Sequence, residues 1–305
     1  MKNFLLLLLA VSLFSFITTK KNIITSKVTV PPGTVMLREG LYIDKFEISN
    51  AMWREFTHGW LLGVEDDTAS FNKMAPDSTV WYSLKIDRDR FIYNYHVASQ
   101  FGNFPAVGIS YEQAVAFCEW RTDRVNEMID KNPGNFSFRK VTYRLPTEGE
   151  WELAAAGKLD TARYPYGSME TKILTKEDSL KMFNCVYADL DSIHNTIQPL
   201  PVSIDYGKAN GYGIYNIIGN VAEMVSEKGL AKGGFYELPL EYCKIRERSG
   251  YNTPNRYLGF RCICTTNSGF GIKPDKDALK NEKPAKTESK KDRSKKKTQG
   301  FEVDQ

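Results

Sequence analysis

The residues of this chain best suited to chemistry are its five cysteines, because a thiolate is both a nucleophile and a ligand for soft metals. Their spacing does not fit a zinc module. No C-x-x-C pair occurs, and the close pair Cys262 and Cys264 has no histidine or second pair beside it. The odd count leaves at least one thiol unpaired within a monomer. The five are Cys118, Cys185, Cys243, Cys262 and Cys264.

Other catalytic patterns are missing from the sequence. The three histidines, His58, His96 and His194, are scattered, and neither H-E-x-x-H nor G-x-S-x-G occurs. No nucleophile with a neighbouring base can therefore be named. The glycine-rich stretch 210–220 lacks the third glycine and the preceding parallel strand of a dinucleotide-binding loop. These patterns favour neither a hydrolase nor a nucleotide-binding enzyme.

Short strands and capped helices alternate along the body of the chain. Residues 28–35 and 40–48 predict strands, and Asn50 is expected to cap the helix that follows. Ser110 with Gln113, and Thr147 with Glu150, have the capping-box spacing, and each precedes an apolar helical stripe. Beyond residue 157, short segments are broken by Gly, Pro and Asn. The pattern predicts an α+β fold.

Both ends of the chain differ from this body. Residues 1–19 place one lysine before an apolar run, which is the layout of a secretory signal peptide, although an uncleaved anchor stays open. No cysteine lies near the end of the run, so no lipid-modified cysteine is expected, and membrane association should be peripheral or through partners. Residues 273–305 predict a disordered basic tail that solubilises the chain or binds an anionic lipid or a partner.

The positive charge is concentrated in that tail. The chain has a formal net charge of +4, and residues 273–305 hold eleven Lys and Arg against seven Asp and Glu, which is also +4. The folded body is therefore close to neutral. Because nucleic-acid binding needs positive charge on the folded surface, no nucleic-acid partner is expected.

Four sequence blocks resemble the sulfatase-modifying-factor domain of formylglycine-generating enzymes. They are GLYIDKFEISNAMWREF (40–56), FPAVGISYEQAVAFCEWRT (104–122), YRLPTEGEWELAAAG (143–157), and NGYGIYNIIGNVAEM (210–224) with LGFRC (258–262). Their order and spacing cover nearly the whole body. The resemblance implies a single domain over residues 28–268 with the mixed fold related to C-type lectins.

The same resemblance implies a calcium site. By position, the ligands would be the side chains of Asn216 and Glu223 and the backbone carbonyls of Gly219 and Val221. Oxygen ligands of this kind suit calcium, a hard cation that takes six to eight of them. The other interpretation is an Asn/Gly turn with a nearby surface glutamate.

The family's oxidase chemistry uses copper(I) held by two cysteines five residues apart. Cys243 lies in about the right place, but Arg248 stands five residues later, so the second thiolate is absent and copper is not expected. A pairing of Cys243 with Cys264 is the remaining route to a second sulfur. The resemblance also implies a structural disulfide between Cys118 and Cys262.

The stretch between residues 63 and 104 is a long excursion rich in aromatic residues. Such residues suit partner contacts, but they could equally fold back as a satellite core. The candidate partner-binding residues are Trp81, Tyr82, Phe91, Tyr93 and Tyr95.

Residues 76–110 and the following WRTDRVNE resemble the gliding-motility and type IX secretion relatives of the domain more than the enzymes. The first hypothesis is therefore an exported, non-catalytic binding or scaffold protein of the periplasm or outer-membrane periphery, with protein partners of the cell envelope. The alternative is a divergent copper-dependent oxidase that converts a cysteine in a peptide to formylglycine.

Overall fold

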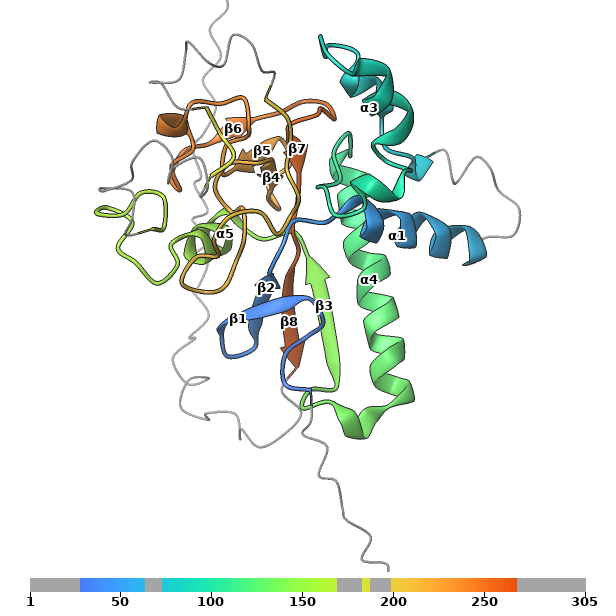
Figure 1. Cartoon of the computed structure of the whole chain (residues 1–305). Coiled ribbons are helices and arrows are strands. Elements are labelled where there is room, and N and C mark those ends of the chain that lie inside the picture. Colours follow the sequence, from blue (N-terminus) through green and yellow to red (C-terminus); the bar gives the residue numbers. More distant parts are fainter. Residues whose placement is uncertain (1–27, 64–72, 169–182, 187–198, 268–305) are drawn as a thin grey trace, which may run out of the picture. The chain divides into compact units, whose positions relative to one another are not determined.

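Two small four-stranded sheets form the framework of the fold (Figure 1). The computed structural model describes residues 28–63, 73–168, 183–186 and 199–267. The first sheet has the order β1-β2-β8-β3 and is antiparallel throughout, and the second has the order β6-β5-β4-β7 with β4 and β7 parallel. The strands are β1 (Thr34–Arg38), β2 (Leu41–Asp44), β3 (Lys140–Arg144), β4 (Ala222–Met224), β5 (Leu230–Lys232), β6 (Ser249–Gly250), β7 (Leu258–Gly259) and β8 (Ile263–Asn267).

Helices surround these sheets. The α-helices are α1 (Asn50–Gly63), α3 (Arg88–Asn94), α4 (Tyr111–Lys131) and α5 (Glu148–Ala155). Short 3-10 helices occupy Ser78–Trp81, Ser99–Phe101, Pro133–Asn135 and Leu240–Tyr242. The mixture of helices with two largely antiparallel sheets confirms the α+β prediction.

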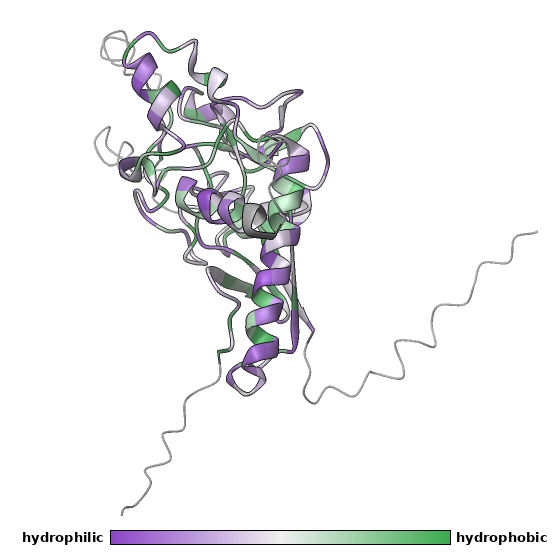
Figure 2. Ribbon diagram, turned by 90° about the vertical axis from the view of Figure 1, so that its right-hand side faces the viewer, coloured by the Kyte–Doolittle hydropathy of each residue, from purple (hydrophilic) through white to green (hydrophobic). Residues whose placement is uncertain are grey.

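The longest helix, α4, runs along β3 at the edge of the first sheet (Figure 1). Its predicted capping box is confirmed: the Ser110 hydroxyl accepts a hydrogen bond from the Gln113 backbone N–H, and the Gln113 side chain accepts one from the Ser110 N–H. Green and purple residues recur along this helix in Figure 2, as expected for one with a buried and an exposed face. Asn126 on α4 exchanges two hydrogen bonds with the backbone of Val141, which partly satisfies the free edge of β3.

The cap of α1 differs from the prediction. Ser49, rather than Asn50, accepts the hydrogen bond from a first-turn N–H, that of Met52. The buried Asn50 amide instead donates to the carbonyl oxygens of Tyr95 and Phe101. Asn50 therefore fastens the start of α1 to the distant end of the aromatic excursion, a contact that a local sequence pattern does not reveal.

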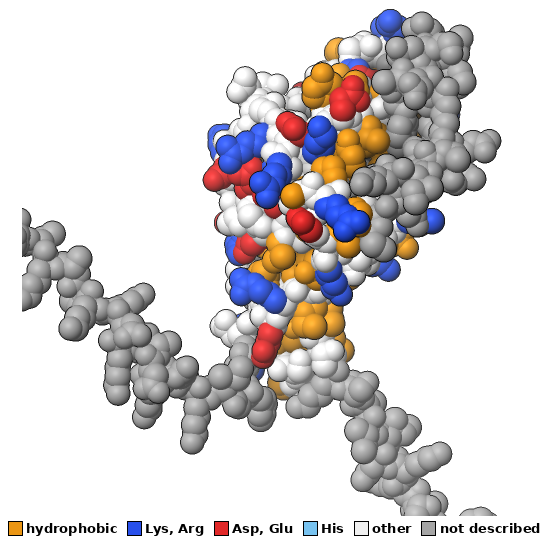
Figure 3. Space-filling view, turned by 90° about the vertical axis from the view of Figure 1, so that its left-hand side faces the viewer, with side chains coloured by type: hydrophobic (Ala, Val, Ile, Leu, Met, Phe, Trp, Pro, Cys, Tyr) orange, Lys and Arg blue, Asp and Glu red, His pale blue; other side chains and the backbone are white. Residues whose placement is uncertain are grey.

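The surface carries charges of both signs. On the face drawn in Figure 3, Lys and Arg side chains lie among Asp, Glu and hydrophobic side chains, without a single-sign patch. Among the described residues, none of the helices has the length and apolar character that crossing a membrane requires.

Cys118 on α4 and Cys262, just before β8, meet in the core with their sulfur atoms 3.4 Å apart. Both are free thiols in this structure, so the predicted disulfide is not present in it. Both side chains are buried, and burial together with the contact to Cys118 raises the pKa of Cys262 well above its usual range. Within the described residues, the predicted partners are thus adjacent but unbonded, and their cross-linking stays a prediction.

We expect the Cys118–Cys262 bond to form when the full chain is refolded in an oxidising glutathione buffer. Because the loop it closes is longer than 100 residues, the oxidised chain should unfold with a free energy about 4–5 kcal/mol higher than the reduced one. Peptide mapping by mass spectrometry would identify the linked pair, with Cys185→Ser as a control that keeps it. Recovery of Cys118 and Cys262 as separately alkylated peptides would contradict the prediction.

Candidate functional site

A buried ion pair lies where the two sheets meet. The Arg261 guanidinium donates from Nε and Nη2 to both oxygens of Glu223, at 2.7 and 2.6 Å, and both side chains are almost completely buried. Trp151 of α5 donates from its indole N–H to the same carboxylate at 2.7 Å. Arg261 also donates to the carbonyl oxygens of Asp44 and Tyr215. One cation thereby joins β2, β4 and the loop that precedes β4.

This arrangement bears directly on the predicted calcium ligands. The Glu223 carboxylate already accepts three hydrogen bonds, and Arg261 supplies the positive charge that it faces. The Asn216 amide donates to the carbonyl oxygen of Ser203 at 3.1 Å. No cluster of three or more His, Cys, Asp or Glu suited to a metal occurs among the described residues. Glu223 is thus paired with Arg261 in this structure, and calcium at Asn216, Gly219, Val221 and Glu223 stays a prediction of the sequence.

A second buried carboxylate, that of Glu47, lies beside this pair. Its Oε1 accepts a 2.8 Å hydrogen bond from the Asn220 amide, and Oε2 accepts a longer one, 3.4 Å, from Asn216. The pKa of Glu47 is raised to about 8, mainly by burial. The charge of Arg261 opposes this rise, and the charge of Glu223 adds to it. One arginine thus faces two buried carboxylates, so Glu47 keeps its proton at neutral pH.

Cys243 is sealed in the core. Its side chain is fully buried, and the sulfur lies 3.6 Å from the Pro239 carbonyl oxygen. The Gly234 backbone presses on the thiol so closely that a Cβ at Gly234 would be 2.3 Å from the sulfur. Arg248 lies at the surface, where its guanidinium binds Glu148. Because residue 248 is an arginine, this position supplies no second thiol to pair with Cys243.

Cys264 does not complete the pair. Cys264 belongs to the core cluster around α4, whereas Cys243 belongs to the cluster around α5, so the structure does not bring these two together. Cys185 shares the second cluster with Cys243, and both side chains are buried. Copper(I) needs soft thiolate ligands at close spacing, and neither position 248 nor Cys264 supplies one beside Cys243.

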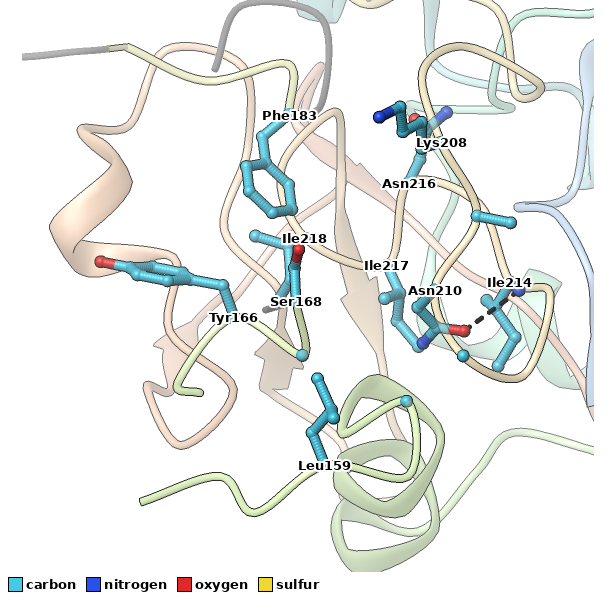
Figure 4. Close-up of a pocket in the computed structure, with 14 residues that line it drawn as sticks. Leu159, Tyr166, Ser168, Phe183, Lys208, Asn210, Ile214, Asn216, Ile217 and Ile218 are labelled. Atoms are coloured by element: carbon cyan, nitrogen blue, oxygen red, sulfur yellow. Dashed lines mark hydrogen bonds between the residues drawn. The ribbon is translucent and has the colours of Figure 1, made fainter. Parts of the chain in front are cut away.

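A cavity of about 250 Å³ lies between the segment that follows α5, residues 157–168, and the stretch 208–218 (Figure 4). Tyr166 and Phe183 lie on one side of it, and Ile214 and Ile217 on the other. The Asn210 amide holds its loop by accepting a hydrogen bond from the Ile214 N–H. Its described lining has no Cys, His, Asp or Glu. Tyr166, Ser168 and Lys208 are the side chains of this lining that can exchange a proton.

The aromatic excursion folds largely into a satellite core, which corrects part of the predicted partner surface. Trp81, Phe91 and Tyr95 are buried and pack together, with ring centroids 4.6–5.7 Å apart. Tyr82 and Tyr93 are exposed. Burial removes the first three from any contact surface, and only the last two stay available to a partner.

Arg261 and Glu47 are the main residues of this site that the sequence did not single out. Arg261 lies in the block LGFRC, and Glu47 lies in the block GLYIDKFEISNAMWREF. Charged residues are rarely buried without a partner, so the sequence favours a surface position for each. For Arg261, a charged residue inside the otherwise apolar block LGFRC was the available signal.

Comparison with known proteins gives one family and several relatives. A family model described as "Sulfatase-modifying factor enzyme 1-like domain" matches residues 14–266. The chain is 26% identical over 279 residues to the formylglycine-generating enzyme of Mus musculus, covering 76% of this chain and 68% of that protein. It is 29% identical to the formylglycine-generating enzyme of Thermomonospora curvata, and this match covers 52% of this chain and 55% of that protein.

A further relative, from Bos taurus, is described as "Inactive C-alpha-formylglycine-generating enzyme 2" and is 27% identical, covering 76% of this chain and 78% of that protein. Among solved structures, Treponema denticola variable protein 1 matches with a TM-score of 0.45 and 19% identity, covering 77% of this chain and 92% of that one. PvdO from Pseudomonas aeruginosa matches with a TM-score of 0.46 and 16% identity, covering 74% of this chain and 80% of that one.

The protonation of Glu47 predicts a pH dependence of stability. The folded chain keeps this proton up to pH about 8, whereas the unfolded chain releases it near 4.5, so stability from this group is complete below 4.5 and is lost as pH rises towards 8. Glu47→Gln cannot ionise and should remove a slope of up to about 1.4 kcal/mol per pH unit. Urea denaturation from pH 5 to 8.5 measures it.

The matched control is Glu223→Gln, which leaves Arg261 buried without its counter-charge. We expect it to lose about 3–5 kcal/mol at pH 5, where Glu47 is protonated and cannot replace the lost charge. Parallel pH profiles for the wild-type chain and Glu47→Gln would contradict the role of Glu47.

The burial of Phe91 and the exposure of Tyr93 predict unequal effects on the free energy of unfolding for these two residues of α3. Phe91→Ala should lower the free energy of unfolding by about 3–5 kcal/mol because it opens a cavity in the satellite core. Tyr93→Ala should change it by less than about 0.5 kcal/mol because that ring is exposed. Denaturant unfolding of both variants checks the assignment, and equal losses would refute it.

Proposed function

The chain belongs to the sulfatase-modifying factor enzyme 1-like family, and from that premise we propose that it uses the family's fold for binding and not for catalysis. The family's oxidation of a substrate cysteine needs two thiolates to hold copper(I). The proposal is thus a non-catalytic binding or scaffold protein that acts through a partner protein.

The observation that carries this proposal is the isolation of Cys243. Counted five residues in either direction, its neighbours are Leu238 and Arg248, and neither is a cysteine. The thiol itself is fully buried beneath Gly234, so a substrate peptide has no open path to it. A copper centre would require both a second sulfur and an exposed coordination position.

The relatives are compatible with either a catalytic or a non-catalytic role for this chain. Several carry the name of an active formylglycine-generating enzyme, whereas the relative from Bos taurus carries the name of an inactive one. Loss of activity within a retained fold therefore has a named example among proteins about as similar to this chain as the enzymes are.

The proposed setting is the cell envelope, within a machinery of the gliding-motility or type IX secretion type. It rests on the signal-like residues 1–19 and on the resemblance of residues 76–110, both of which are sequence patterns. In this setting, exposed Tyr82 and Tyr93 are the aromatic residues of the excursion that remain for contact with an envelope protein.

Copper(I) titration of the reduced full-length chain tests the proposal. We expect no tight one-to-one complex in the wild-type chain, because one buried thiol cannot hold copper(I) alone. Leu238→Cys should gain binding, since the new thiol would stand five residues before Cys243 at a half-buried position, and it would supply both the second sulfur and the exposed coordination position.

Arg248→Cys is the matched control, because it also creates a five-residue spacing but at an exposed position fixed to Glu148 in the wild-type chain. It should not gain tight binding. A one-to-one copper(I) complex of the wild-type chain that disappears in Cys243→Ser would overturn the proposal and favour the divergent oxidase.

A further inference from the structure

The two terminal segments of the chain join the folded body at the same end. The first described residue, Val28, bonds the loop after α4: its N–H donates to Asn135, and its carbonyl oxygen accepts from Ser137. The last described residue, Asn267, ends β8 opposite Lys140, the first residue of β3. Figure 1 shows the start of β3 and the end of β8 beside the C-terminal end of α4. We call residues 28–30, 127–140 and 267 the terminal pole.

Both terminal segments carry groups that favour a membrane surface. Residues 1–27 hold the apolar run 4–17 and then Lys20, Lys21 and Lys27, and residues 273–305 hold eleven Lys and Arg against seven Asp and Glu. Removal of residues 1–19 would leave these lysines in place. Basic clusters are attracted to anionic phospholipid headgroups, and two attachment signals reinforce each other. A membrane that holds both segments therefore faces the terminal pole.

Hydrophobic side chains are exposed at the terminal pole itself. Val28 is 42% exposed, and Val30 and Met128 are each 37% exposed. The two valines lie on the segment that enters the body, and Met128 lies in the last turn of α4. Apolar side chains on a basic surface can enter the boundary between the headgroups and the acyl chains of a bilayer. The pole thus offers an apolar contact in addition to charge.

The charged groups of the terminal pole leave an excess of cations. Both of its acidic residues are paired, Asp130 with Lys140 at 2.8 Å and Glu127 with an arginine of α4 at 2.6 Å. Lys131 and Arg139 are exposed and add two positive charges. The adjacent turn between β1 and β2 holds one basic and one acidic residue, whose charges cancel. This balance favours an anionic partner surface.

The aromatic excursion lies at the other end of the body. Gln113, in the first turn of α4, donates to the carbonyl oxygens of Lys73 and Ala75 in the excursion, whereas the terminal pole follows the last turn of α4. A helix of 21 residues is about 30 Å long, and Figure 1 shows α3 and the C-terminal end of α4 at opposite ends. The exposed Tyr82 and Tyr93 are therefore remote from the pole.

We propose that the terminal pole rests on an anionic phospholipid membrane and that the molecule presents Tyr82 and Tyr93 away from it, toward the partner protein. Lys131 and Arg139 contact the phosphate headgroups, and the exposed valines and methionine contact the headgroup boundary. This inference rests on the envelope setting of the proposed function. Membrane binding and copper(I) binding are separate measurements, so each of the two proposals can fail without the other.

Flotation of the full-length chain with lipid vesicles tests the proposal. One set of vesicles is pure phosphatidylcholine, and the other contains equal parts of phosphatidylcholine and phosphatidylglycerol. We expect at least about tenfold tighter binding to the mixed vesicles, because several basic residues act together at an anionic surface. Binding to the neutral vesicles measures what the apolar run 4–17 contributes without charge, and added salt should remove the difference between the two sets. Equal binding to both sets, or binding to neither, would overturn the proposal.

A pair of double variants separates the terminal pole from the basic tail. Lys131→Glu with Arg139→Glu should lower the preference for the mixed vesicles at least about tenfold. Lys85→Glu with Arg88→Glu is the matched control, because it makes the same charge change at exposed positions of the excursion, and it should bind as the wild-type chain does. Equal melting temperatures show that both variants are folded.

Two results of this comparison would refute the role of the pole. If both double variants bind as the wild-type chain does, residues 273–305 act without the folded surface. If both lose the preference equally, only the net charge of the chain matters, and the molecule has no preferred orientation on the membrane.

Discussion

The guanidinium of Arg261 is the group on which the arrangement of this fold depends. It is completely buried, and it reaches Glu223 on β4, the end of β2 at Asp44 and the loop at Tyr215. A buried ion pair is not a strong source of net stability, but removing one partner leaves an uncompensated charge in the core. The two sheets and α5, through Trp151, are thereby held in one relative position.

The same constraint leaves the polar groups around the loop before β4 paired with one another. Glu223 is fully occupied by Arg261 and Trp151, and the neighbouring Glu47 stays protonated between two asparagine amides. The polar groups here satisfy one another, and the one nearby thiol of the family's chemistry, Cys243, is enclosed. A site whose polar groups are already paired supports the shape of the protein, while surfaces elsewhere remain for binding.

The segment that carries α3 has an inner side that packs in the protein and an outer side with exposed groups. Its inner side forms a satellite core around Trp81 and Tyr95, which fixes the segment against α1. Its outer side leaves Tyr93 exposed and, with α1, encloses a cavity lined by His96 and Arg54. A rigid inner side is what allows the outer groups to present a defined binding geometry.

The sequence alone determined the features that depend on neighbouring residues. The capping box of α4 requires groups three residues apart, and the prediction that Cys243 lacks a second copper ligand rests on the spacing around it. Spacing on α3 also held unused information, since buried Phe91 and Tyr95 are four residues apart and exposed Tyr93 lies between them. Only the tertiary structure decided the pairing of Arg261 with Glu223 and the second role of Asn50, because contacts between distant segments depend on packing that no local pattern encodes.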